Sequence, residues 1–269
     1  MLTTLTGLVV RERTVGEADK FIDILTDSHG LIEVSVRGAQ KMTAKHGSAA
    51  QLFAYSTFCI AQRKERYYLN SASPIHIFYG LRQSIEGVSL ASYFAEVLCA
   101  AVRPVEQKSD ILRLTLNTLH FLEKETRPLP LLKALFELRL LTELGMMPNI
   151  ICCDICGEYT PEHLEFYLQS GVFICKDCAA QSTDHSEHMA VSGHVLQAIR
   201  HIVLADFDRL FHFRLGDRSL RDLSALAERY LLLHLDRRFK TLDFYHSLND
   251  WAPPAEEPHE PPHPNTGTT

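Results

Sequence analysis

Four cysteines have the spacing of a metal site. Cys153 and Cys156 form one Cys-x-x-Cys pair, eighteen residues follow, and Cys175 and Cys178 form a second pair. Two such pairs at this separation place four thiolates at the corners of a tetrahedron, which is how Zn²⁺ binds in structural sites. Four protein ligands leave no position for water, so the pattern predicts one structural zinc ion (Zn2+). Two disulfides are the alternative, and they are typical of secreted chains.

The residues around these cysteines predict a small β-ribbon. Gly157 follows the first pair, where a positive φ allows backbone amides to turn toward the sulfur atoms. A turn is expected at Ser170-Gly171, between two short strands. We therefore predict a four-cysteine zinc ribbon over residues 151–180, inserted between helices of one bundle. The apolar and aromatic residues expected in it are Tyr159, Leu164, Phe166, Tyr167, Val172 and Phe173.

A second group of residues with a chemical role is basic. Residues 35–66 contain six Lys or Arg and one acidic residue, Glu65, although the whole chain has a net charge of −6. The acidic excess lies in residues 151–269, which hold 18 Asp or Glu against 10 Lys or Arg. Screening limits the reach of a charge to about 8–10 Å at physiological salt, so the local cations predict phosphate binding. A solvated surface is the alternative for each of these residues alone: Arg37, Lys41, Lys45, Arg63, Lys64 and Arg66.

The basic residues lie in a segment that predicts a small β-barrel. Residues 1–78 contain five β-prone runs, at about 5–10, 21–25, 31–37, 52–60 and from 67 onward. Five strands in about 70 residues suit an OB fold, and an SH3-like barrel has a similar pattern. Barrels of the OB type bind single strands in a basic groove where bases stack on aromatic rings. By alternation, about half of the local aromatic residues belong to the core: Tyr55, Phe58, Tyr67 and Tyr68.

The remainder of the chain predicts an α-helical domain over residues 79–250. From Pro74 the apolar period changes to 3.6, with helices expected at 84–102, through 112–119, at 131–144, 192–205 and 219–238. Gly145 is expected to end the third helix, and Ser219 to Asp222 is expected to cap the last. Residues 181–189 are expected to form a polar loop. The acidic, proline-rich residues 251–269 are expected to be disordered. The fold class is thus α+β and multidomain.

Several functional classes have no support in the sequence. The chain has no Gly-x-x-x-x-Gly-Lys-Ser/Thr loop for a nucleotide cofactor, no Gly-x-Ser-x-Gly elbow and no His-Glu-x-x-His helix. We therefore predict that the protein is not an enzyme and assign no catalytic residue. No apolar run approaches the roughly 20 residues that span a bilayer, and no leader sequence is recognised. We expect a cytoplasmic protein with no membrane partner.

The chain resembles the RecO family of bacterial recombination mediators. Its segments Gly7–Arg11, Gly16–Lys20 and Leu25–Leu31 are similar to that family's first strands and their connections. Arg37-Gly38-Ala39 is similar to its Lys/Arg-Gly-Ala element, and the two Cys-x-x-Cys pairs match its zinc element. The resemblance covers about residues 1–250, and it rests on the combination rather than on any one motif. It adds Arg11 and Lys20 to the candidate DNA-binding residues.

The resemblance implies a function that the residues alone do not. It implies an N-terminal OB fold that binds single- and double-stranded DNA and anneals complementary strands. It also implies DNA repair and homologous recombination, in which RecA is loaded onto DNA coated by single-stranded DNA-binding protein. The implied partners are RecR and the acidic, apolar C-terminal tail of the coating protein, and the implied location is the nucleoid. An apolar groove with a cation in the helical domain is the expected site for that tail.

Two other readings remain open at the level of sequence. One is a zinc-stabilised protein-interaction module without direct DNA binding. The other is a transcription regulator that places the ribbon on duplex DNA. The interior of the ribbon contains a single cation, Lys176, which disfavours phosphate binding there.

Overall fold

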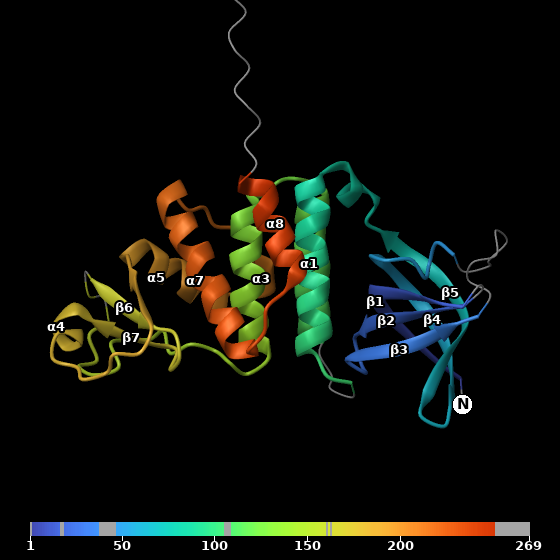
Figure 1. Cartoon of the computed structure of the whole chain (residues 1–269), viewed down its shortest axis with the longest axis horizontal. Helices are drawn as coiled ribbons and strands as arrows, with labels where there is room; N and C mark the ends of the chain where they lie inside the picture. Colours follow the sequence, from blue (N-terminus) through green and yellow to red (C-terminus); the bar gives the residue numbers. More distant parts are fainter. Residues whose placement is uncertain are drawn as a thin grey trace, which may run out of the picture.

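The structure is a computed structural model, and it describes residues 2–16, 19–37, 47–104, 109–159, 161 and 163–250. A β-barrel, a group of helices and a small β-ribbon follow one another along the long axis of the molecule (Figure 1). Residues 251–269, for which disorder is expected, lie outside the described residues, as do Lys41 and Lys45. None of the described helices is long and apolar enough to cross a membrane.

The N-terminal segment forms a closed five-stranded barrel with the strand order β1-β2-β3-β5-β4. Antiparallel pairing of β1 with β4 closes it, and the chain runs antiparallel everywhere except between β3 and β5. Side chains at alternate positions fill the interior, among them Ile24, Val34 and Phe58. This confirms the predicted OB fold. The strands are β1 (Leu2–Val15), β2 (Asp19–Thr26), β3 (Leu31–Val36), β4 (Ala54–Arg63) and β5 (Arg66–Ile77).

The last barrel strand is longer than expected. Strand β5 continues past Pro74 to Ile77, where the sequence predicted a change to helix. A register shift beside Ser56, the partner of Pro74 on β4, accommodates the proline. Because proline has no N–H to donate, it is tolerated in a strand at such an irregularity.

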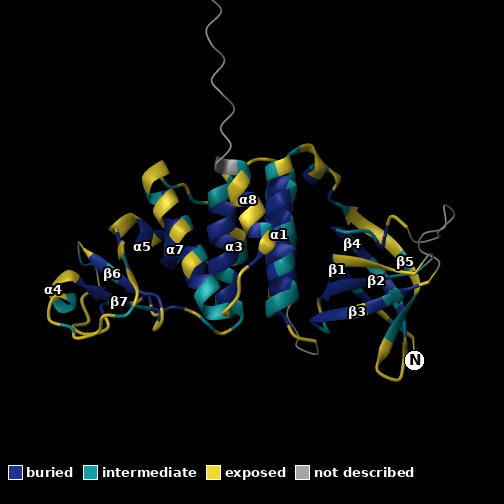
Figure 2. Ribbon diagram, viewed as in Figure 1, coloured by how far each residue is buried: buried dark blue, intermediate teal, exposed yellow. Residues whose placement is uncertain are grey.

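The helices that follow have a buried centre. Helix α3 is buried along most of its length, as its almost uniformly apolar sequence predicted (Figure 2). It ends where expected, because Gly145 has a φ of +85° and its N–H and that of Met146 satisfy carbonyls of the last turn. The elements are η1 (Tyr79–Gln83), α1 (Ile85–Ala101), α2 (Ser109–Glu123), α3 (Leu129–Glu143), α5 (Gly193–Leu204), α6 (Phe207–Leu210), α7 (Asp217–Leu235) and α8 (Lys240–Asp250).

Two expectations for this region are wrong, and one helix was not predicted. Helix α7 begins at Asp217 after the N-cap Gly216, so Ser219 lies inside the first turn and does not cap it. Helix α8 was not predicted, because its few buried residues, such as Leu242 and Tyr245, give a short and weak pattern. The expected loop over 181–189 contains the start of a strand, which pairs with the ribbon and gains its order from that contact.

The ribbon has three strands in the order β7-β6-β8 and packs against the helices. Phe166 and Phe173 contact each other, and Phe166 contacts Tyr230 of α7 edge-on with ring centroids 5.2 Å apart. Gly171 forms the predicted turn with a φ of +67°, and a Cβ there would lie 2.6 Å from the Tyr230 hydroxyl. Its elements are β6 (Leu164–Tyr167), β7 (Val172–Cys175), α4 (Lys176–Ala179) and β8 (His188–Val191).

A buried ionic network joins the central helices. Lys133 Nζ on α3 lies 3.0 Å from Glu137 Oε1 and 2.7 Å from Glu228 Oε2 of α7. The Tyr93 hydroxyl of α1 donates to Glu137 at 2.8 Å, and His246 of α8 lies 2.9 Å from Glu228. Burial raises the pKa of Glu137 to about 7, although Lys133 and Tyr93 act in the opposite direction. Four helices therefore depend on one buried cation.

Removal of that cation should destabilise the protein. Lys133→Met leaves Glu137 buried without its counter-ion, so we expect a loss of about 3–5 kcal/mol in the free energy of unfolding, measured with urea. Since the folded-state pKa of Glu137 lies above the ordinary value, the stability that its proton provides is lost as pH rises. The loss should therefore be larger at pH 8 than at pH 5.

The double variant Lys133→Met/Glu137→Leu is the matched control. It removes both buried charges and should recover at least half of the lost stability. Equal losses in the single and double variants would contradict the role assigned to the network.

Candidate nucleic-acid interface and metal centre

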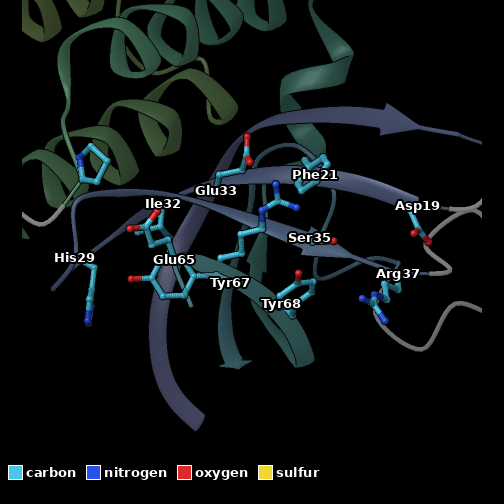
Figure 3. A pocket seen from close by; sticks show the side chains of 12 residues that line it. Asp19, Phe21, His29, Ile32, Glu33, Ser35, Arg37, Glu65, Tyr67 and Tyr68 are labelled. Atoms are coloured by element: carbon cyan, nitrogen blue, oxygen red, sulfur yellow. The ribbon is translucent and has the colours of Figure 1, made fainter. Parts of the chain in front are cut away.

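A pocket lies on the outside of the barrel where β3 meets β5 (Figure 3). These strands are paired only through Val34 with Tyr67 and Ser35 with Tyr68, so the sheet is open on either side of the contact. The pocket has a volume of about 530 Å³, and we call it the barrel pocket. It is lined by Asp19, Phe21, His29, Ile32, Glu33, Ser35, Arg37, Glu65, Arg66, Tyr67, Tyr68 and Pro104.

Three connections of the barrel converge on this pocket. Asp19 follows the β1–β2 connection, Arg37 begins the β3–β4 connection, and Glu65 lies in the β4–β5 hairpin. The hairpin is tight, since Arg63 is paired with Arg66 and Lys64 has a φ of +55°. Residues from distant parts of the sequence therefore meet at one place on the barrel.

Tyr68 carries two guanidinium groups near its ring. The Cζ atom of Arg37 lies 5.2 Å from the centroid of that ring, and the Cζ atom of Arg63 lies 5.7 Å from it. In Figure 3, Tyr68 and Arg37 lie side by side at one end of the pocket, and His29 lies at the other. An aromatic ring next to cations can stack with a base while the arginines contact phosphates.

One acidic residue of the pocket, Glu33, is partly neutralised by a cation of the barrel itself. Glu33 forms an ion pair with Arg13 of β1, and Arg13 Nη2 also lies 3.2 Å from Asp23 Oδ1. The hydrogen bond with Glu33 raises the pKa of Arg13 above its ordinary value, which burial alone would lower. Glu33 therefore repels an approaching phosphate less than an unpaired carboxylate would.

The structure divides those candidate DNA-binding residues that it describes into two groups. Arg37 and Arg66 line the barrel pocket, Arg63 reaches its Tyr68, and Lys64 is exposed at the adjacent hairpin. The second group, Arg11 and Lys20, contacts other residues of the barrel and does not line the pocket. Arg11 forms an ion pair with the buried Asp23, and Lys20 Nζ lies 3.0 Å from Glu12 Oε2 and 2.6 Å from the carbonyl oxygen of Ala50.

Sequence reasoning overlooked one aromatic residue of the pocket. Phe21 was assigned only to a strand, yet it lines the pocket from β2. The signal was available, because Asp19, Phe21 and Asp23 alternate on one face of that strand. Of the aromatic residues considered, Phe58 belongs to the core, whereas Tyr68 is half-buried beside the cations.

The four cysteines of the ribbon form a cluster that can hold a metal ion. Their Sγ atoms all lie within 4.8 Å of one another, and those of Cys156 and Cys175 are 3.7 Å apart. A tetrahedral ion with metal–sulfur bonds of about 2.3 Å requires sulfurs about 3.8 Å apart, so the geometry fits. All seven cysteines are free, which disfavours the disulfide alternative. Gly157 has the expected positive φ of +77°.

The environment of the cluster also suits a cation. Burial raises the pKa of the Cys153 thiol, but hydrogen bonds from the backbone of Cys156, Cys175 and Ile155 outweigh this and lower it to about 6. The neighbouring Cys175 sulfur raises the pKa of Cys178 to about 12. Four thiols this close cannot all ionise unless a positive ion compensates their charges.

Arg200 of α5 fixes the first cysteine pair to the helices. Its buried guanidinium donates from Nε to the carbonyl of Ile150 at 2.7 Å. From Nη2 it donates to the carbonyls of Ile151 and Tyr159, at 2.6 and 2.8 Å, and its Cζ lies 4.1 Å from the centroid of the Tyr159 ring. The two ends of the cysteine loop are therefore joined by one side chain.

A second pocket lies among the helices, between the α2–α3 connection and the segment before α7. It has a volume of about 280 Å³, and we call it the helix pocket. Arg127, whose Nε donates to the carbonyl of Phe211 at 2.9 Å, and the exposed Arg214 supply its charge. Among the described residues, its lining is otherwise mainly apolar and includes no acidic residue: Thr126, Arg127, Pro128, Leu131, Phe213, Arg214, Leu215 and Leu220.

Comparison with known proteins finds matches to both the barrel segment and the helical segment of the chain. The profile described as "Recombination protein O N terminal" matches residues 1–78, and "Recombination protein O C terminal" matches residues 82–243. A "DNA repair protein RecO" of Acetivibrio thermocellus is 28% identical over 244 residues, which cover 90% of this chain and 96% of that protein. A "DNA repair protein RecO" of Alkaliphilus metalliredigens is 26% identical over 244 residues, which cover 90% of this chain and 98% of that protein. The chain therefore belongs to the RecO family of DNA repair and recombination proteins.

Proposed function

We propose that this protein is a non-enzymatic mediator of homologous recombination that binds single- and double-stranded DNA and anneals complementary strands. The observation that carries this proposal is the pair of arginines beside Tyr68 in the barrel pocket. In the proposed role it helps to load RecA onto DNA coated by single-stranded DNA-binding protein, together with RecR. Such a mediator makes and breaks no covalent bond, so binding energy alone has to supply its activity.

The barrel pocket offers a DNA strand two kinds of contact, ion pairs with its phosphates and stacking with its bases. Phosphates that contact Arg37, Arg63 and Arg66 release counter-ions, which makes the affinity depend on salt but not on sequence. A base on the ring of Tyr68 adds stacking energy without reading its edge, so any sequence is tolerated. A strand held in this way keeps its pairing edges accessible to a complementary strand, which is what annealing requires.

The ribbon is proposed to bind one structural zinc ion through Cys153, Cys156, Cys175 and Cys178. When bound, the ion neutralises the four thiolates and cross-links the two ends of the ribbon. Arg200 of α5 and Tyr230 of α7 hold the ribbon against the helices. The ribbon is thus a support of the helical part and not the DNA-contacting surface.

The helix pocket is the proposed site for the tail of single-stranded DNA-binding protein. An acidic tail with apolar residues requires cations beside an apolar surface, and Arg127 and Arg214 lie beside Leu131 and Phe213. The absence of acidic residues from the described lining of the pocket removes one source of repulsion. Separate pockets for the strand and for its coating protein allow both to be bound at the same time.

Loss of the arginines and loss of Tyr68 should change DNA binding in different ways. Loss of two phosphate contacts in Arg37→Ala/Arg63→Ala should reduce the slope of log K against log salt by about 1.4 for a single strand. Tyr68→Ala should weaken binding by about 1–3 kcal/mol through lost stacking, with the slope nearly unchanged. Fluorescence anisotropy with a labelled oligonucleotide at four salt concentrations measures both quantities.

Arg113→Ala is the matched control for this experiment. Arg113 is also an exposed arginine beside an aromatic ring, that of Phe207, but it belongs to α2 and not to the barrel. Its loss should leave affinity and slope nearly unchanged. If the wild-type protein does not bind DNA at low salt while it retains its metal, the protein-interaction module is the better description.

Substitution of a predicted zinc ligand and substitution of the adjacent non-ligand Cys152 should have different effects on the zinc content. Cys175→Ser removes a ligand, so the zinc content measured by mass spectrometry should fall from one ion per chain to near zero, with a loss of several kcal/mol in stability. Because protons compete for the thiolates, zinc should also be released as pH falls. Cys152→Ser changes the residue beside the first pair and should retain the metal. Full zinc content in Cys175→Ser would contradict this ligand set.

A further inference from the structure

The last described helix, α8, ends at the end of the bundle where the helix pocket lies. His246 of α8 lies 2.9 Å from Glu228, which lies 2.7 Å from Lys133 of α3. Lys133 and Leu131, a residue of the helix pocket, both lie in the first turns of α3, on different faces of that helix. In Figure 1, α8 ends at the same end of the bundle at which α3 begins. The residues after α8 therefore start at the end of the bundle where the helix pocket lies.

The segment that follows α8 has a composition complementary to this pocket. Residues 251–269 contain three glutamates, six prolines and no Lys or Arg. The glutamates are Glu256, Glu257 and Glu260, and the only tryptophan of the chain, Trp251, precedes them. Nineteen extended residues span up to about 60 Å, whereas the fifteen residues of α3 span about 22 Å. The segment is long enough to reach the pocket with residues to spare.

We propose that the acidic segment 251–269 occupies the helix pocket of its own chain and competes there with the tail of the coating protein. This inference rests on the proposed function, because the competition requires that the partner tail uses the same pocket. The glutamates pair with Arg127 and Arg214, and the prolines pack on the apolar lining, as proline-rich segments do in aromatic-lined grooves. The barrel pocket is the poorer alternative for an acidic segment, since Asp19, Glu33 and Glu65 line it.

Such a contact would set a threshold for partner binding. A tethered segment has an effective concentration on the order of millimolar, so even a weak contact occupies the pocket for much of the time. An external peptide then binds with an affinity reduced by the fraction of free pocket. A high local concentration of coating-protein tails, as on a covered strand, would overcome this competition.

Hydrogen–deuterium exchange of the full chain and of residues 1–250 tests the contact directly. We expect residues 126–131 and 211–216 to exchange several-fold faster without the segment. The full-length variant Glu256→Gln/Glu257→Gln/Glu260→Gln should behave like the truncated chain. His259→Gln/His263→Gln keeps all three glutamates and serves as its control. Equal exchange in all forms, or protection at the barrel pocket instead, would overturn the proposal.

A binding experiment with a labelled peptide separates this proposal from the proposed function. The probe carries aspartates followed by apolar residues at a free C-terminus, and truncation should raise its affinity by about five- to tenfold. Arg214→Glu should abolish peptide binding, whereas Arg221→Glu, on the first turns of α7 but outside the pocket, should not. If truncation leaves the affinity unchanged, the competition fails while the partner site stands. If neither form binds the peptide but the exchange differs, the partner assignment fails and the internal contact stands.

Discussion

The closure of the barrel is the constraint on which the site depends. In this barrel the fifth strand lies between the third and the fourth, and closure depends on β3 and β5, which meet through two residue pairs. Short pairing leaves the outer surface of the sheet open on both sides of the contact. The connections that begin or end there bring Arg37, Arg63 and Arg66 to one opening beside Tyr68. The chemistry of the pocket is therefore a consequence of the topology.

The helical part of the chain also holds the cysteine ribbon in place. Two kinds of contact connect the ribbon with the helices. Packing of Phe166 on Tyr230 and on Phe173 supplies apolar burial. Arg200 supplies hydrogen bonds to carbonyls of the cysteine loop. Both sets of contacts form between segments far apart in the sequence. The metal organises the ribbon, and these contacts determine where the ribbon is placed.

The sequence predicted features that depend on local pattern. Alternation identified the barrel strands, the 3.6 period identified α3, and the cysteine spacing identified the cluster. Features that depend on tertiary contact were missed. Helix α8 and strand β8 are short and gain their order from the bundle and the ribbon. The helix pocket combines two groups of residues that are separated in the sequence, 126–131 and 213–220. The pairing of Arg11 with Asp23 likewise depends on strand register, which a basic residue in a sequence does not reveal.

The central claim is that DNA contacts the barrel and not the ribbon, and photo-crosslinking tests it most directly. A single-stranded oligonucleotide with 5-iodouracil at several positions is irradiated with the full-length protein, and the crosslinked residues are identified by mass spectrometry. Since base stacking brings the halogenated base onto an aromatic ring, the account predicts crosslinks at Tyr68 and its pocket neighbours Tyr67 and Phe21. Crosslinks confined to ribbon residues such as Tyr159 or Tyr167, with none on the barrel, would contradict it.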